Sequence, residues 1–233
     1  MSKTALVTGG NAGLGLAVVD RFLENGYRVL VVDRNISNLK TPPYNEVRAI
    51  EFDLSGVEDI PTLIKELGDI DILVNNAGIM NSIPYDDYPE ERRNLLMKID
   101  IEAPVALIRE VTPAMIANGH GRIVNLASIA GQVGHPDIWY GIAKAGVINM
   151  TKSFAKLLGP KGIVINSVAP GPAETDLLQT IPEQRRTEIK NAVYTGRFAK
   201  PEEVASTVFW LATSCPEYIN GTCIDINNGA FPR

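Results

Sequence analysis

The sequence predicts an α/β fold, a single doubly wound domain with a mainly parallel seven-stranded sheet and helices on both faces. Three observations support this fold. Short runs rich in Val, Ile and Leu recur along the chain, longer segments with helical spacing separate them, and the runs are apolar on both faces. Strands that lie between two layers of helices have this continuous apolar character. Repeated strand–helix–strand units indicate a parallel sheet, and right-handed crossovers favour the doubly wound topology.

Each expected strand is a short β-branched run, such as "KTALVT" near the N-terminus and "RVLVVD" after the first helical segment. The expected strands are Lys3–Thr8, Arg28–Asp33, Val47–Phe52, Asp71–Asn75, Arg122–Ala127, Ile163–Val168 and Thr222–Ile226.

The helices are expected where apolar residues recur at helical spacing. The first carries Leu14, Val18 and Phe22 on one stripe and stops at Gly26, a typical helix end. Pro201 opens the last helix, at a position where its missing N–H has little effect. The expected helices are Leu14–Asn25, Val57–Leu67, Pro89–Asn118, Ile138–Leu158 and Pro201–Thr213.

The chain contains no internal repeat, low-complexity tract or linker, so residues 1–233 are expected to form one domain. The segment Gly171–Lys200 is polar and contains no strand. A long segment of this kind inside a compact domain is typical of an active-site lid. Leu177, Leu178 and Ile181 would give that lid a partly apolar surface.

Composition argues against several classes of function. The formal net charge of -5 disfavours a general nucleic-acid surface, and no apolar run approaches the length that crosses a bilayer. The N-terminus lacks the apolar stretch of a signal peptide, and Cys215 and Cys223 are too few for a disulfide scaffold. A cytoplasmic location is therefore expected. His120 and His135 lie apart without a cysteine cluster, so no metal site is expected.

A glycine-rich loop, "TGGNAGLG" at Thr8–Gly15, joins the first strand to the first helix. Its glycines permit a tight turn and let the backbone approach a pyrophosphate, while the helix N-terminus offers free N–H groups to the phosphates. The strand–turn–helix context makes dinucleotide binding the preferred interpretation over a simple turn. The doubly wound sheet is therefore expected to be of Rossmann type. The expected contacts in this loop are Gly9, Asn11, Gly13, Leu14 and Gly15.

Further motifs follow in a characteristic order. They are "NNAG" at Asn75–Gly78, Ser128, "YGIAK" at Tyr140–Lys144 and "PGPAET" at Pro170–Thr175. With the TGxxxGxG loop, they make the chain resemble the classical short-chain dehydrogenase/reductase family over nearly its whole length. Within the family, the sequence most resembles the 3-oxoacyl-acyl-carrier-protein-reductase-like members. The resemblance implies a nicotinamide dinucleotide cofactor.

Further cofactor contacts are implied by the resemblance. Asp53 could instead be a strand-end or capping carboxylate, and "PGPAET" could be a proline-fixed turn. The positions similar to family contacts with adenine and its ribose are Asp53, Leu54, Asn76, Ala77 and Gly78, and those near the nicotinamide are Pro170, Gly171, Ala173 and Thr175.

Asp33 bears on the choice between NAD and NADP. It ends the second expected strand, where a carboxylate can accept hydrogen bonds from the ribose hydroxyls and repel a 2′-phosphate. Arg34 beside it could attract that phosphate, or could lie along the adenine or in solvent. NAD is the expected cofactor, and NADP is the alternative.

Tyr140 and Lys144 are four residues apart, which places both side chains on one helix face. A free phenol has a pKa near 10 and is a poor base at neutral pH. An ammonium about 4 Å away contributes about 4 kcal/mol at an effective dielectric of about 20, in favour of the phenolate. In the family mechanism, the residue matching Tyr140 transfers the proton and the one matching Lys144 also holds the nicotinamide ribose. The residue matching Ser128 hydrogen-bonds the substrate oxygen, although a serine here could equally cap a turn.

The chain departs from the family pattern in three places. Ser128 precedes Tyr140 by twelve positions, one fewer than is common, and Trp139 replaces a small residue. Asp100 aligns with an asparagine of the family that is associated with a water chain to the lysine. If a backbone carbonyl holds that chain, aspartate suffices. If the side chain matters, the added anion would alter the proton relay, stabilise Lys144 as a cation and raise the pKa of Tyr140, opposing the effect of the lysine. Asp100 could instead be a solvated or water-linked helix residue.

These observations predict an NAD(H)-dependent oxidoreductase that interconverts a secondary alcohol and a ketone, with catalytic residues Ser128, Tyr140, Lys144 and Asp100. The alternatives are a cofactor-binding regulator or sensor with little turnover, an NADP(H)-dependent ketone reductase, and an isomerase or dehydratase, which the length disfavours. Fold alone does not choose among them. The resemblance also implies a homotetramer or homodimer.

Overall fold

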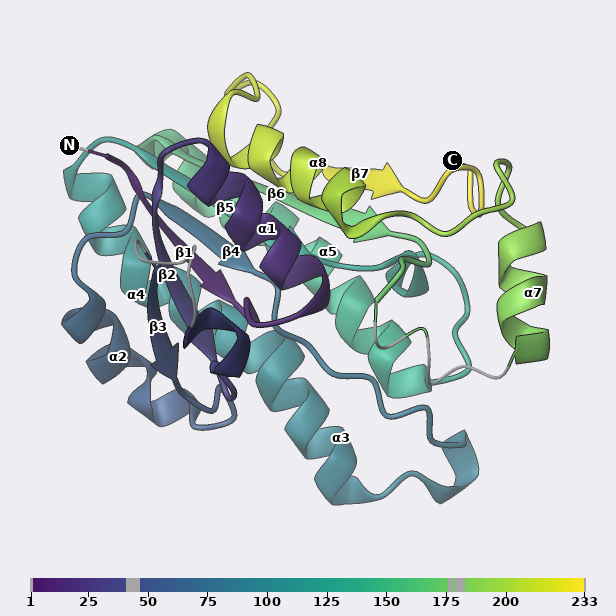
Figure 1. The fold of residues 1–233 in the computed structure, drawn as a ribbon. Helices are drawn as coiled ribbons and strands as arrows, with labels where there is room; N and C mark the ends of the chain where they lie inside the picture. The colour runs from purple at the N-terminus through teal and green to yellow at the C-terminus, as the bar shows by residue number, and fades with distance from the viewer. Residues whose placement is uncertain (1, 41–46, 176–177, 179–182, 233) are drawn as a thin grey trace.

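The computed structural model describes residues 2–40, 47–175, 178 and 183–232, and contains the expected seven-stranded parallel sheet (Figure 1). The strand order is β3-β2-β1-β4-β5-β6-β7, and neighbouring strands pair in parallel. The strands are β1 Thr4–Thr8, β2 Arg28–Asp33, β3 Val47–Glu51, β4 Ile72–Asn75, β5 Gly121–Leu126, β6 Ile163–Pro170 and β7 Cys223–Ile226.

Helices cover both faces of the sheet, as the continuous apolar strands predict (Figure 1). On one face lie α1 (Gly13–Glu24) and α8 (Pro201–Thr213), and on the other lie α2 (Ile60–Leu67), α4 (Ala103–Ala117) and α5 (Ile138–Leu158). Successive side chains of β1 alternate between the two cores, since Ala5 and Val7 face α1 and α8 while Leu6 faces the opposite layer.

Phe22 anchors α1 in its core. The side chain is fully buried, and its ring makes edge-on contacts with Tyr27 and Phe209 at centroid distances of 5.3 and 5.2 Å. Truncating such a residue to alanine costs about 3–5 kcal/mol. Phe22 therefore helps to fix the helix whose N-terminus follows the glycine loop.

The expectation of one continuous helix at Pro89–Asn118 is wrong. The structure has α3 at Glu90–Met97, a π-helical turn at Lys98–Glu102, and then α4. Pro104 has no N–H to donate to the carbonyl of Asp100, four residues earlier, so the α-helical pattern is interrupted there. The backbone N–H of Ala103 instead bonds the carbonyl of Lys98. This turn carries Asp100, which is 1% exposed.

Part of the expected lid, residues 171–200, is described. Ala173 and Ala199 form a parallel bridge at its base, and α7 occupies Glu183–Asn191. Leu178 is buried, whereas Leu177 and Ile181 lie outside the described residues.

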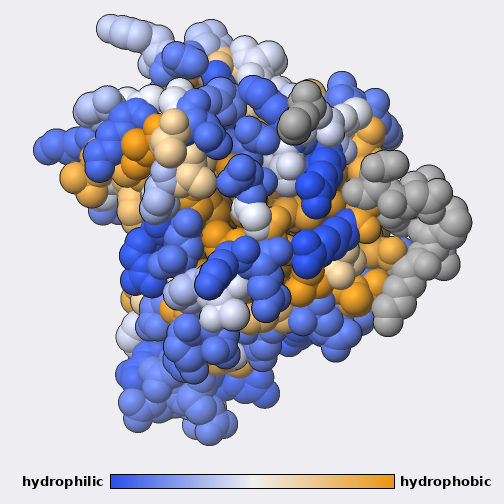
Figure 2. Space-filling model, turned by 90° about the vertical axis from the view of Figure 1, so that its left-hand side faces the viewer, coloured by the Kyte–Doolittle hydropathy of each residue, from blue (hydrophilic) through white to orange (hydrophobic). Residues whose placement is uncertain are grey.

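The outer surface is mixed. Hydrophilic residues make up most of the face shown in Figure 2, and hydrophobic residues are visible between them. Among the described residues, no helix combines the length and apolar character needed to cross a bilayer.

The sheet reverses its strand order between β1 and β4. From β1 the chain adds β2 and β3 on one side, then crosses to place β4 on the other side of β1. The carboxyl ends of β1 and β4 consequently diverge into helices on opposite faces, and ligands of open α/β sheets bind at such a point.

Candidate active site

A cleft of about 590 Å³ lies at the carboxyl ends of the strands. Its walls come from the glycine loop, the ends of β2 to β5, and the N-terminal part of α5. The lining residues are Gly9, Ala12, Gly13, Leu14, Gly15, Val32, Asp33, Arg34, Phe52, Asp53, Leu54, Asn76, Ala77, Gly78, Ile79, Met80, Ile99, Leu126, Ala127, Tyr140, Lys144 and Thr175.

The glycine loop has the geometry expected of a phosphate-binding turn. Gly9 has a φ of +66°, and a Cβ on Gly15 would lie 1.9 Å from the carbonyl oxygen of Gly9. Ala12, the N-cap of α1, supplies no side-chain cap, and no acidic residue lies in the first turn. The helix N-terminus therefore presents backbone N–H groups and a positive dipole to the cleft, which fits a dinucleotide pyrophosphate.

The "NNAG" segment packs directly on this loop. The Asn76 amide donates to the carbonyls of Thr8 and Gly9, both at 2.9 Å. The Thr8 hydroxyl oxygen accepts the N–H groups of Asn76 and Ala77, both at 3.1 Å. These bonds join the ends of β1 and β4 and shape the floor of the cleft.

Two carboxylates line the cleft at the ends of β2 and β3. Asp33 accepts the backbone N–H groups of Asn11 at 3.0 Å and Asn35 at 3.1 Å. Asp53 accepts the N–H of Ser55 at 2.8 Å, and the backbone and hydroxyl of Ser55 hold the pKa of Asp53 below its ordinary value. Both carboxylates line the cleft where an adenosine ribose fits.

Tyr140 and Lys144 lie together on the first turns of α5, and both line the cleft. The Lys144 Nζ is 5.5 Å from the centre of the Tyr140 ring. It donates to the carbonyl of Leu126 at 3.1 Å, and lies 2.9 Å from Asp100 Oδ2. The spacing that the sequence placed on one helix face thus brings an ammonium to the side of the phenol.

Asp100 keeps Lys144 charged. Burial of Lys144 lowers the pKa of its amine, but the Asp100 carboxylate and the Tyr140 phenol raise it, and the net direction is above the ordinary value. Asp100 is itself held through Oδ1, which accepts the N–H of Ile79 at 2.8 Å. A Cβ on Gly78 would lie 2.8 Å from Asp100 Oδ2 and 2.9 Å from Lys144 Nζ, which explains a glycine at that position.

Ser128 lies at the end of β5 and caps a short 3₁₀ turn. Its Oγ accepts the N–H of Ala130 at 3.1 Å, so both the capping interpretation and the catalytic one remain compatible with the structure. The hydroxyl hydrogen is still available to donate to a substrate oxygen.

The cleft does not include every expected cofactor contact. Within the described residues, Asn11, Pro170, Gly171 and Ala173 are not part of its lining, nor are Asp100 and Ser128. Asn11 instead holds the loop to Asn38, accepting its backbone N–H and side-chain amide. Gly171 lines a second pocket of about 270 Å³, beside the C-terminal segment.

Several lining residues were not expected from the sequence. Ile79 and Met80 directly follow "NNAG", and Ile99 directly precedes Asp100, so proximity to a motif was the available signal. Phe52 and Ala127 follow β3 and β5, where the carboxyl ends of strands supply contacts.

Known proteins match the chain over nearly its whole length. A family profile described as enoyl-(acyl carrier protein) reductase matches residues 9–230. The chain is 31% identical to a 3-oxoacyl-[acyl-carrier-protein] reductase, FabG, of Staphylococcus aureus, over 99% of both chains. It is 34% identical to the reductase of the same name from Thermotoga maritima, over 97% of both.

Solved structures agree with the fold. A 4-hydroxyisoleucine dehydrogenase complexed with NADH superposes with a TM-score of 0.91 at 27% identity, over 99% of both chains. ElxO with NADP bound gives a TM-score of 0.90 at 29% identity, over 100% of both. A short chain dehydrogenase/reductase family protein gives 0.91 at 29% identity, over 98% of this chain and 97% of that one. Together with the site, these matches show that the chain belongs to the classical short-chain dehydrogenase/reductase family of oxidoreductases and is similar to its 3-oxoacyl-acyl-carrier-protein reductases.

Proposed function

We propose that the protein is an NAD(H)-dependent oxidoreductase that interconverts a secondary alcohol and a ketone. The observation that carries this proposal is the pair formed by Tyr140 and Lys144, which lines the same cleft as the phosphate-binding loop. Hydride chemistry requires the protein to transfer one proton and to orient the substrate, and a phenol beside an ammonium in the cofactor cleft can do both.

Each catalytic residue has a separate task. The Tyr140 hydroxyl gives its proton to the substrate oxygen during reduction and takes it back during oxidation. The Lys144 ammonium stabilises the phenolate that remains, and would hold the nicotinamide ribose when the cofactor is bound. The Ser128 hydroxyl donates to the substrate oxygen and stabilises its developing charge. When bound, the nicotinamide supplies or accepts the hydride.

Asp100 acts on this pair without reaching the cleft surface. Its carboxylate fixes Lys144 in place, but its charge also offsets part of the ammonium charge that acts on Tyr140. The protein would therefore hold Lys144 firmly while stabilising the phenolate less than an uncompensated lysine does.

NAD(H) is the preferred cofactor because Asp33 lines the cleft at the end of β2. Its carboxylate would repel a 2′-phosphate and can accept a ribose hydroxyl. Arg34 also lines the cleft, which keeps an NADP(H)-dependent ketone reductase as the alternative. Similar structures hold either NADH or NADP, so the carboxylate carries the preference.

The substrate is proposed to be a partly apolar ketone or alcohol, since Ile79 and Met80 line the cleft. A 3-oxoacyl thioester is the first compound to test, because the curated relatives are named for that reaction. The second candidate function, a cofactor-binding regulator with little turnover, is favoured by the charge of Asp100 beside Lys144.

The test is to follow nicotinamide absorbance with the purified protein against a panel of ketones and alcohols, including a 3-oxoacyl thioester, with each cofactor. Turnover with NADH exceeding that with NADPH supports the proposal. Tight cofactor binding without turnover on any compound favours the regulator, and tighter binding of NADP(H) than NAD(H) refutes the role of Asp33. A single domain, a lid at residues 171–200, a homo-oligomer and a cytoplasmic location remain predictions.

A further inference from the structure

A buried carboxylate that the sequence motifs do not include lies just before the catalytic helix. Asp137 is 1% exposed, and its two oxygens accept three backbone N–H groups from two separate segments. We propose that Asp137 is a positioning residue, which clamps the segment lining the cleft to the N-terminus of α5 and thereby sets where the Tyr140 hydroxyl lies. This inference rests on the proposed function for its catalytic consequence.

On the helix side, Asp137 is the N-cap of α5. Its Oδ1 accepts the backbone N–H of Tyr140 at 3.1 Å, so the cap bond is made to the residue that bears the phenol. Aspartate is a preferred N-cap residue, and its negative charge interacts favourably with the positive end of the helix dipole. The Asp137 carboxylate thus holds the backbone N–H of Tyr140 at the N-terminus of the helix.

On the other side, Asp137 holds the segment that follows "NNAG". Its Oδ2 accepts the N–H groups of Asn81 at 3.0 Å and Ser82 at 2.9 Å. These residues come directly after Ile79 and Met80, which line the cleft. A movement of this segment would therefore change both the wall of the cleft and the N–H of Ile79 that holds Asp100.

The conformation of Ser82 shows that the clamp opposes a backbone preference. Ser82 has a φ of +53°, in the left-handed region that is unfavourable for a non-glycine residue. Hydrogen bonds to a charged group are stronger than those between neutral groups, so the two bonds to the Asp137 carboxylate offset that cost. Without the carboxylate, the segment would relax away from α5.

The main chain of Asp137 adds a further contact. Its N–H donates to His135 Nδ1 at 3.2 Å, and the His135 ring lies 5.3 Å from the Tyr140 ring, centre to centre. Asp137 therefore fixes three groups near the phenol: the first turn of α5, the segment Asn81–Ser82 that follows the cleft wall, and the His135 imidazole.

The variant that tests the clamp is Asp137→Ser. Serine is also a preferred N-cap residue, so it retains the bond to the Tyr140 N–H, but one short hydroxyl cannot also hold Asn81 and Ser82. We expect faster amide hydrogen exchange at those two residues, a cofactor Kd within about twofold of the wild type, and a kcat lower by about 10- to 100-fold. We also expect a larger primary deuterium isotope effect with deuterated NADH, because a misplaced phenol makes the chemical step slower.

A second variant, Asp137→Asn, keeps the shape of the side chain. Its single carbonyl oxygen can serve one segment but not both, so exchange and kcat should fall between those of the wild type and Asp137→Ser. Asp86→Ser, at an exposed carboxylate, is the matched control and should leave every quantity unchanged. If Asp137→Ser does not fold, Asp137→Asn decides alone.

A variant that shows faster exchange at the Asn81 and Ser82 amides but keeps the wild-type kcat and isotope effect would overturn the positioning role. A purely structural clamp would behave in that way. If the wild type turns over no substrate, the proposed function fails. The clamp is then judged by exchange alone: faster exchange in Asp137→Ser supports it, and equal exchange in the two proteins refutes it.

Discussion

Lys144 Nζ lies 2.9 Å from Asp100 Oδ2, and the two side chains are only 6% and 0% exposed. A buried pair of this kind stabilises the charge on each partner, and removing one partner leaves the other charge uncompensated. Here the ammonium has a second task, because it also lies 5.5 Å from the centre of the Tyr140 ring. Asp100 therefore both fixes Lys144 and weakens its influence on the phenol.

Replacing Asp100 with asparagine is expected to raise turnover. The variant keeps the side-chain shape and an oxygen for the N–H of Ile79, but it removes the charge that opposes Lys144. We expect kcat to rise about 2- to 10-fold, equivalent to about 1 kcal/mol. Measuring kcat against pH checks this, with Glu102→Gln in the same π-helical turn as control. An unchanged kcat would show that the carboxylate does not hinder the proton relay.

The same variant has a second expected effect, on stability at alkaline pH. Asp100 raises the pKa of Lys144 in the folded protein, so the charged lysine contributes stability that is complete below the ordinary lysine pKa of about 10.4. That contribution is lost as the pH rises through the raised value. The wild type should therefore exceed Asp100→Asn in urea midpoint at pH 8, and the difference should shrink towards pH 11 and above.

Asp33 is expected to determine cofactor choice. In Asp33→Ser the carboxylate that faces the ribose is lost, so NAD(H) affinity should fall about tenfold while NADP(H) affinity rises. Isothermal titration with both cofactors measures the ratio, and Asp59→Ser at an exposed position is the control. An unchanged ratio of NAD(H) to NADP(H) affinity would show that another residue determines the selectivity, and Arg34 would be the first to examine.

Gly15 is expected to tolerate no side chain. A Cβ there would lie 1.9 Å from the Gly9 carbonyl and 2.5 Å from the Asn76 amide nitrogen, so the loop would have to open. Gly15→Ala should lose measurable cofactor binding and about 1–3 kcal/mol of unfolding free energy. Gly134→Ala is the matched control, since its Cβ would meet nothing within 4 Å. Equal cofactor affinity in both variants would contradict the close approach.

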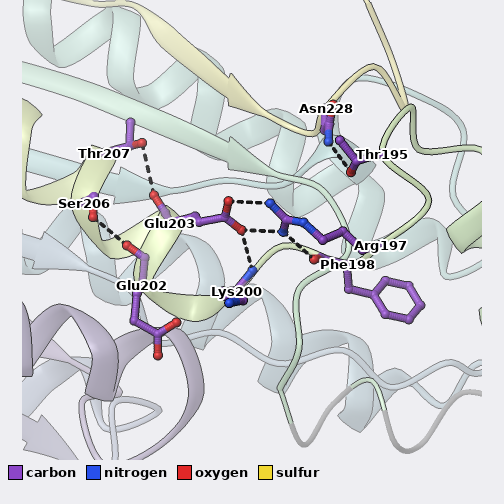
Figure 3. A network of polar contacts seen from close by, with 9 residues as sticks. All are labelled: Thr195, Arg197, Phe198, Lys200, Glu202, Glu203, Ser206, Thr207 and Asn228. Atoms are coloured by element: carbon purple, nitrogen blue, oxygen red, sulfur yellow. Dashed lines mark hydrogen bonds and ion pairs between the residues drawn. The ribbon is translucent and has the colours of Figure 1, made fainter.

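Figure 3 shows the ion pair at the start of α8, in which Arg197 binds Glu203 of the first turn through two bonds of 2.7 Å. The Arg197 guanidinium, together with the Lys200 N–H, lowers the pKa of Glu203 to about 2. A lowered carboxyl pKa contributes stability above about pH 4.3, and that contribution disappears as the pH falls towards the lowered value.

Glu203→Gln should consequently be less stable than the wild type in urea at pH 7 and equal to it near pH 2. The effect is small because the pair is exposed to solvent. Glu202→Gln removes the same charge from the same first turn, so it controls for the helix dipole. If both variants lose equal stability, the Arg197 pair contributes nothing beyond that dipole.

Local sequence was sufficient to predict the strands and those helices whose ends are marked by nearby residues. The helices at Ile138–Leu158 and Pro201–Thr213 were predicted to the residue, and the seven strands to within two residues at each end. Apolar periodicity fixes which residues face the core, and Pro201 marks a helix start without reference to other segments. The match to the family motifs in turn located the cleft.

Contacts between distant segments were not accessible in this way. The π-helical turn depends on Pro104, but its position also reflects the packing of Asp100 against Lys144. The clamp by Asp137 joins it to Asn81, 56 residues earlier, and no periodic pattern reports such a pairing. Asn11 was expected among the cofactor contacts, but it lies outside the cleft lining. Its side-chain oxygen accepts the Asn38 N–H, and its backbone carbonyl accepts the Asn38 side-chain amide.

The most direct test of the central claim is hydride transfer by Tyr140→Phe, which removes one oxygen atom and leaves the ring beside Lys144. Single-turnover oxidation of bound NADH by the best ketone should slow about 10²- to 10⁴-fold, with NADH affinity and thermal midpoint unchanged. Tyr85→Phe, at a tyrosine that is 73% exposed, should transfer hydride at the wild-type rate. A Tyr140→Phe protein that transfers hydride as fast as the wild type would show that this phenol is not the proton donor.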